Sequence, residues 1–93
     1  MVQAFLWDPV KESGNWNKHG VTFDEAVSAF GDPLSVTIAD PKHSLSESRF
    51  VLTKFAVTGR LLVVTLVERG DYIRIINAPL ATRRERLVYE EGI

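Results

Sequence analysis

The sequence predicts an α+β fold, an antiparallel β-sheet with two helices from the first half of the chain packed on it and a C-terminal helix. Two observations lead to this class. Strand-like stretches follow one another at hairpin spacing in the second half, and the helical signals lie outside that run. The chain has 93 residues, enough for one domain, so we expect residues 1–93 to form a single unit.

Two apolar runs, Leu61–Val67 and Tyr72–Ile76, form the predicted centre of the sheet. Their Val and Ile content favours strands, and Gly70 between them can take the positive φ of a tight turn. The first run is apolar on both faces, which is typical of an interior strand covered on each side. Arg74 interrupts the second run, so its guanidinium must reach an edge, an acid or a ligand. A salt bridge at the rim is the simplest alternative.

The remaining elements are predicted from capping residues and periodicity. Asp8-Pro9 begins a helix that stops at Gly20, and the pairs Thr22/Glu25 and Thr82/Glu85 form two further capping boxes. The predicted helices cover residues 9–18, 23–30 and 83–91, and the other predicted strands cover residues 3–7, 34–39 and 49–56. The second helix presents one apolar face to the sheet, formed by Phe23, Ala26, Val27 and Phe30.

Composition excludes several kinds of chemistry. The chain has no cysteine, which removes disulfides, thiolate zinc sites and thiol catalysis. It has two histidines and no ligand cluster at metal spacing, and it lacks a glycine-rich phosphate loop, so neither a metal nor a cofactor is predicted. We find no signal-peptide pattern and no apolar run near the ~20 residues of a membrane span, so a cytoplasmic protein without membrane contact is expected.

The net charge of −1 hides an asymmetry along the chain. Residues 49–86 hold eight Lys/Arg against three Asp/Glu, a basic block that attracts phosphates or an acidic partner. The last helix carries arginines at its positive end and glutamates at its negative end. An arginine-rich helix start favours an anion. Phosphate, an acidic protein and plain solvent remain the alternatives for this surface.

Two sequence blocks carry a family resemblance. The first comprises Trp7-Asp8-Pro9, Lys11, Asn15-x-x-Lys18-His19-Gly20-Val21-x-Phe23-x-Glu25-Ala26 and Phe30-Gly31-Asp32-Pro33. The second comprises Gly59-Arg60-x-Leu62, Glu68-Arg69, Ile73-Arg74-Ile75-Ile76, Ala81-Thr82-Arg83-Arg84-Glu85-Arg86 and Tyr89-Glu90. Together they resemble the BrnT family of bacterial type II toxins over nearly the whole chain.

This resemblance implies a RelE-like fold, a ribonuclease activity that inhibits translation, and a BrnA-type antitoxin as partner. It also implies that DNA is contacted only indirectly, through the antitoxin, when the complex represses its own operon. One position departs from the family pattern, because Pro79 stands where an arginine is usual. The alternative reading is therefore a weak or inactive toxin that binds its antitoxin in operon autorepression. A plain α+β interaction domain is a third possibility.

The implied reaction suggests which side chains to look for. RNA is cut without a metal when its own 2′-OH attacks the adjacent phosphate, so the enzyme must position the chain, accept a proton and stabilise negative charge. The candidates for charge stabilisation are Arg60, Arg69, Arg74 and Arg83. The candidate proton acceptor is Glu68, or Lys18 or His19 if the end of the first helix folds onto the sheet. The candidates for RNA binding are Lys18, His19, Lys54, Arg84 and Arg86.

Overall fold

The structure is a computed structural model that describes residues 4–31, 36–39, 48–70 and 72–92. Its elements in chain order are β1 (Ala4–Trp7), α1 (Pro9–His19), α2 (Phe23–Ser28), the 3-10 turn η1 (Ala29–Gly31), β2 (Val36–Ala39), β3 (Ser48–Phe55), β4 (Leu61–Arg69), β5 (Tyr72–Asn77) and α3 (Arg83–Glu91). The α+β class, the central hairpin and the three helices are as expected. Residues 34 and 35 of the predicted strand 34–39 lie outside the described residues.

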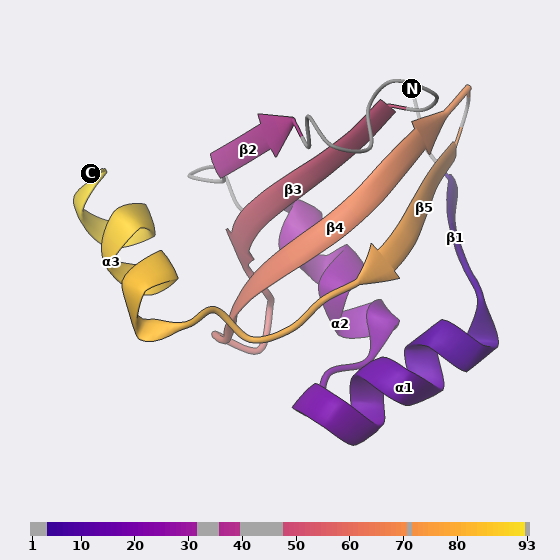
Figure 1. Cartoon of the computed structure of the whole chain (residues 1–93), viewed down its shortest axis with the longest axis horizontal. Helices are drawn as coiled ribbons and strands as arrows, with labels where there is room; N and C mark the ends of the chain where they lie inside the picture. Colours follow the sequence, from indigo (N-terminus) through magenta and orange to yellow (C-terminus); the bar gives the residue numbers. More distant parts are fainter. Residues whose placement is uncertain (1–3, 32–35, 40–47, 71, 93) are drawn as a thin grey trace.

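The sheet has five strands in the order β1-β5-β4-β3-β2. Strands β2 to β5 pair in antiparallel fashion, whereas β1 joins the edge of β5 in parallel, with Ala4 opposite Tyr72. The sheet is therefore mixed, and its first strand is the exception to the antiparallel prediction. Figure 1 shows α2 behind the sheet and α1 below it, near the end of β5, whereas α3 lies on the left, below β2.

Both faces of β4 are buried, as its sequence predicts. Leu62, Val64 and Leu66 point to the side of α2, where they share a core with Phe23 and other apolar residues. We call this side of the sheet the core face. The alternate residues of β4, which include Leu61, Val63 and Val67, are also buried but point to the opposite side. We call that side the open face; α3 covers one end of it.

The helix ends follow their capping residues with one exception. The carboxylate of Asp8 accepts a hydrogen bond from the Val10 N–H at 2.8 Å, and Gly20 closes α1 in the left-handed conformation with φ of 65°. Thr82 and Glu85 form both halves of the capping box of α3. At α2 the Thr22 hydroxyl accepts from the N–H of residue 25, but the return bond predicted from Glu25 is replaced. The carboxylate of Glu25 binds the guanidinium of Arg60 instead, which is a stronger, charge-assisted partner than a backbone N–H.

A buried asparagine joins α1 to the sheet. The side chain of Asn15 is 5% exposed, and its Nδ2 donates to the carbonyl oxygens of Val21 and Ala78, both at 3.0 Å. Its Oδ1 accepts from the N–H of Ala78 at 2.9 Å. The three bonds fix the end of β5 and the turn after α1 against one helix, where the backbone groups would otherwise be buried without partners.

Candidate functional site

Arg74 lies on the open face, in a row of side chains that crosses the sheet. The register places Arg49 opposite Val67, Val67 opposite Arg74, and Arg74 opposite Leu6. Val67 is 1% exposed, so the two arginines flank a buried hydrophobic residue. Adjacent strands lie about 4.8 Å apart, which places the Cα atoms of Arg49 and Arg74 about 10 Å apart. Two guanidinium groups are thus presented on one face from a rigid sheet.

Arg69 and Tyr72 extend this row toward the hairpin turn. They lie opposite each other in the β4–β5 ladder, and by strand alternation they share the open face with Val67 and Arg74. A tyrosine hydroxyl can both donate and accept a hydrogen bond. The sequence analysis missed Arg49 and Tyr72. Alternation along β5 places Tyr72 on the same face as Arg74, whereas Arg49 is placed beside Val67 only by the register of β3 with β4. We refer to Arg49, Arg69, Tyr72 and Arg74 as the arginine row.

Glu68, the first candidate for proton acceptor, is not part of the arginine row. It is exposed, and it lies opposite Ser48 on one side and Ile73 on the other. Because side chains alternate along a strand, Glu68 points to the core-face side while Arg69 points to the open face. The structure therefore separates this carboxylate from Arg74.

Arg60 also lies away from the open face. Its Nε donates to Glu25 Oε2 at 2.8 Å, and its Nη2 donates to Glu25 Oε1 at 2.5 Å and to the Gly20 carbonyl at 2.7 Å. The Thr58 hydroxyl donates to the same carboxylate. The hydrogen bond from Arg60 holds the pKa of Glu25 below its ordinary value, and the same pairing raises the pKa of Arg60. This bidentate clamp ties the start of α2 to the loop before β4.

The clamp predicts a pH-dependent loss of stability. A carboxylate with a lowered pKa stabilises the fold above its unfolded pKa of about 4.3, and this contribution is lost as pH falls through the folded value. Glu25→Gln is expected to lower the free energy of unfolding by about 1–2 kcal/mol at pH 7. Urea unfolding at pH 7 and pH 3 measures it, with the difference between the two proteins shrinking at pH 3. An equal difference at both pH values would contradict this role.

Lys54 is placed where RNA cannot reach it in this structure. It is 6% exposed and points to the core face of β3, with its Nζ 4.3 Å from the centre of the Phe30 ring. The candidate RNA contact is thus corrected to a buried cation–π contact between the sheet and η1. Lys54 is two residues from Leu52 on the same strand and therefore points to the same buried face, and this spacing could have revealed its burial from the sequence.

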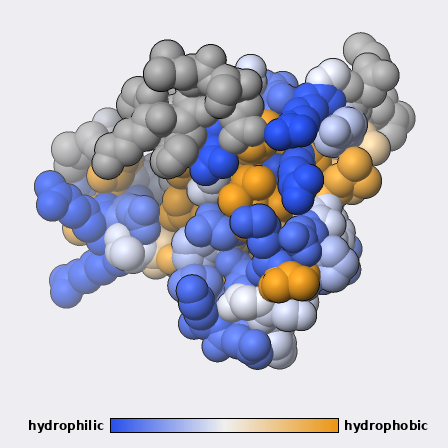
Figure 2. Space-filling view, turned by 45° about the vertical axis from the view of Figure 1, so that its right-hand side comes forward, coloured by the Kyte–Doolittle hydropathy of each residue, from blue (hydrophilic) through white to orange (hydrophobic). Residues whose placement is uncertain are grey.

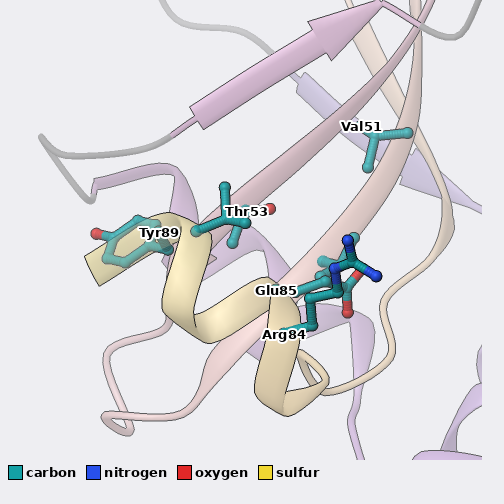
Figure 3. A pocket seen from close by; sticks show the side chains of 7 residues that line it. Val51, Thr53, Arg84, Glu85 and Tyr89 are labelled. Atoms are coloured by element: carbon teal, nitrogen blue, oxygen red, sulfur yellow. The ribbon is translucent and has the colours of Figure 1, made fainter. Parts of the chain in front are cut away.

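The arginines of α3 line the other end of the open face. Arg84 borders a cavity of about 260 Å³ between the helix and the sheet, together with Val51, Thr53, Val63, Glu85, Val88 and Tyr89. In Figure 3, Arg84 and Glu85 lie at one end of the cavity and Tyr89 at the other. Arg86 Nη1 lies 3.6 Å from Glu90 Oε2, and its guanidinium carbon lies 5.7 Å from the Phe55 ring centre. Arg83, at the first helical position, is exposed.

The last two candidates, Lys18 and His19, come to the sheet at a different place. They line a pocket of about 240 Å³ between α1 and the end of β5, which also includes Ile76 and Asn77. The end of the first helix therefore lies beside the sheet, which was the condition for considering Lys18 or His19 as proton acceptor. Figure 2 shows mainly hydrophilic side chains on this side of the molecule, with smaller hydrophobic areas among them.

A small α+β domain with arginines across one sheet face belongs to the class of proteins suited to a phosphate-bearing ligand. The model of a family described as the ribonuclease toxin BrnT of type II toxin-antitoxin systems matches residues 7–85. The chain therefore belongs to the BrnT family of ribonuclease toxins, and the type II system implies an antitoxin as partner. The comparison with curated proteins gave no match.

Two further features of the described residues bear on the site. No cluster of three or more His, Cys, Asp or Glu side chains that could hold a metal ion occurs among them. No helix in this described part of the chain is both long and apolar enough to cross a membrane.

Proposed function

We propose that this protein cuts RNA without a metal ion, on the open face of its sheet. The observation that carries the proposal is the arginine row, which sets Arg49 and Arg74 on either side of the buried Val67. Arg74 has no ion pair with another described residue, so its charge can serve a ligand. A phosphodiester on this face gains charge-assisted hydrogen bonds from a preorganised scaffold, which is the main requirement for stabilising a phosphorane.

The proposed reaction is an internal transesterification. The 2′-oxygen attacks the adjacent phosphorus, the bond to the 5′-oxygen breaks, and the products are a 2′,3′-cyclic phosphate and a free 5′-hydroxyl. The proton of the 2′-OH leaves to a base, and the 5′-oxygen gains one from solvent or an acid. Arg69 and Arg74 stabilise the charge in this scheme, and Tyr72, on the same face, is the candidate for relaying a proton. Arg60 and Glu68 have no role in it.

We infer that the activity inhibits translation in the cytoplasm and that a BrnA-type antitoxin neutralises it. The surface of α3 supports a protein partner, because no residue of this helix is buried and an apolar cavity remains beneath it. Leu87 and Val88 stay 45% and 40% exposed. In this proposal the antitoxin covers α3 and the adjoining open face, and DNA is contacted only through the antitoxin.

One experiment tests both parts of the proposal. Purified protein is incubated with RNA in excess EDTA, with and without the co-expressed antitoxin, and the ends are analysed by mass spectrometry. We expect cleavage with 2′,3′-cyclic phosphate ends, abolished by the antitoxin. Cleavage that stops in EDTA would contradict metal independence, and cleavage unaffected by a bound antitoxin would contradict its placement over the open face.

Pro79 supports a second candidate, a toxin with weak or no catalysis. The carbonyl of Pro79 accepts a hydrogen bond from the Val63 N–H at 3.0 Å, and Leu80 is bridged to Leu62. Alternation then places residue 79 on the open face beside Val63, where an arginine would project toward Arg84. If well-folded protein free of antitoxin leaves RNA intact, this second function holds, and Pro79→Arg is the substitution expected to restore cleavage.

A further inference from the structure

The pocket between α1 and the end of β5 has the features of an anion site apart from the arginine row. It is lined by one face of the helix, contributed by Lys11, Gly14, Asn15, Lys18 and His19, and by Ile76 and Asn77 of the strand. The volume of about 240 Å³ is large enough for a phosphate group with part of its nucleoside. We call it the α1 pocket.

Two lysines, Lys11 and Lys18, line the α1 pocket. Lys11 and Lys18 are seven residues apart, so they share one helix face about 10 Å apart. Neither forms an ion pair with a described residue. Lys18 lies in the last turn of α1, where the helix dipole favours a cation, but Lys11 lies in the first turn, where the dipole disfavours one. Both lysines are exposed and line the pocket, so their charges are accessible to an anionic ligand.

The strand side of the α1 pocket is open where β1 ends. The pairing of β1 with β5 stops at Trp7 and Ile75, and the ladder between β4 and β5 skips Ile76, so this residue forms a bulge. Asn77, the last residue of β5, is exposed and carries an amide that can donate to an anion. In Figure 1, α1 lies across the arrowhead end of β5. A chain leaving the open face past the end of β5 would enter this pocket.

The helix side is unobstructed because of a glycine. Gly14 lies between Lys11 and Lys18 on the pocket face, and a Cβ at this position would meet no atom within 4 Å. No positive φ requires glycine here, and glycine is a poor helix former. Between the two lysines, the floor of the α1 pocket is therefore backbone alone. Any side chain introduced at residue 14 would enter the pocket.

We propose that the α1 pocket binds a backbone phosphate of the substrate RNA, at a subsite separate from the bond that is cut. This rests on the proposed ribonuclease function and extends its binding surface. The two sites are joined by one strand, because Asn77 follows Arg74 by three residues, a distance of about 10 Å along β5. A single RNA strand running along β5 would therefore meet the arginine row first and the α1 pocket next.

The test compares Gly14→Glu with Gly14→Gln. The two new side chains have nearly the same size and shape and differ by one charge. Both are better helix formers than glycine, so neither variant is expected to unfold more readily than the parent. Binding of a 2′-O-methyl oligoribonucleotide, which cannot be cleaved, is followed by fluorescence anisotropy at low salt. We expect the glutamine variant to bind more weakly than the parent because its side chain enters the pocket, and the glutamate variant to bind about tenfold more weakly than the glutamine variant because of its charge.

A dinucleotide substrate and the binding of inorganic phosphate distinguish the possible failures. A dinucleotide reaches only the arginine row, so the parent and both variants should cleave it at equal rates; a parent that cleaves no RNA would refute the proposed function without bearing on the pocket. Equal oligonucleotide affinity for all three proteins would overturn the subsite. The RNA subsite would also be overturned if Gly14→Glu weakened antitoxin binding and left RNA binding unchanged. The same holds if inorganic phosphate bound the pocket while the glutamate and glutamine variants had the same affinity for RNA.

Discussion

Arg74→Gln is expected to lower the rate constant for RNA cleavage on the order of 100-fold, because it removes a preorganised cation from the phosphate that gains charge. The side chain is half-buried on the open face and forms no ion pair with a described residue, so the free energy of unfolding should change by less than about 1 kcal/mol. Single-turnover cleavage of a labelled RNA, with urea unfolding of the same preparations, measures the two effects separately.

Glu68→Gln provides the comparison within the same hairpin. Because Glu68 points to the other side of β4, we expect its replacement to change the cleavage rate by less than about threefold. A loss as large as that of Arg74→Gln would show that the proton acceptor is this carboxylate and would contradict the placement of the reaction on the open face.

Asn15→Ala is expected to have the largest effect on stability, a loss of about 3 kcal/mol or more. It removes three hydrogen bonds and leaves the N–H and carbonyl of Ala78, a residue with 0% exposure, without partners. Asn17→Ala is the matched control, since it makes the same change at an exposed position of the same helix. Urea unfolding of both variants is the measurement. Equal stability of the two proteins would contradict the anchoring role of Asn15.

Helix ends and tight turns, whose conformation is determined by residues close in the sequence, were predictable. Gly20 and Gly92 end their helices in the left-handed conformation, and Thr82 with Glu85 forms its capping box as expected. The β4–β5 hairpin follows from two β-branched runs and the turn at Gly70, whose φ is 57°. Each of these features is decided within a few residues, where propensity and capping act.

The features that join distant segments were not predictable. Nothing near Asn15 indicates that its amide binds Ala78, 63 residues away, and nothing near Glu25 indicates that Arg60 will take its carboxylate from the helix cap. The parallel pairing of β1 with β5 is of the same kind. In the candidate site, the interrupted apolar run identified Arg74, but its neighbour Arg49 comes from another strand and needs the register to place it.

The parallel pairing of β1 also determines when the molecule can become complete during its synthesis. The first strand and the helix after it have no sheet to join until β5 has been made, and the Asn15 anchor needs residue 78 of a 93-residue chain. Contacts of such large sequence separation form late, after the loop between them has been closed. Strand β5 and residue 78 must therefore be synthesised before the first strand and the Asn15 anchor can take their places in the sheet.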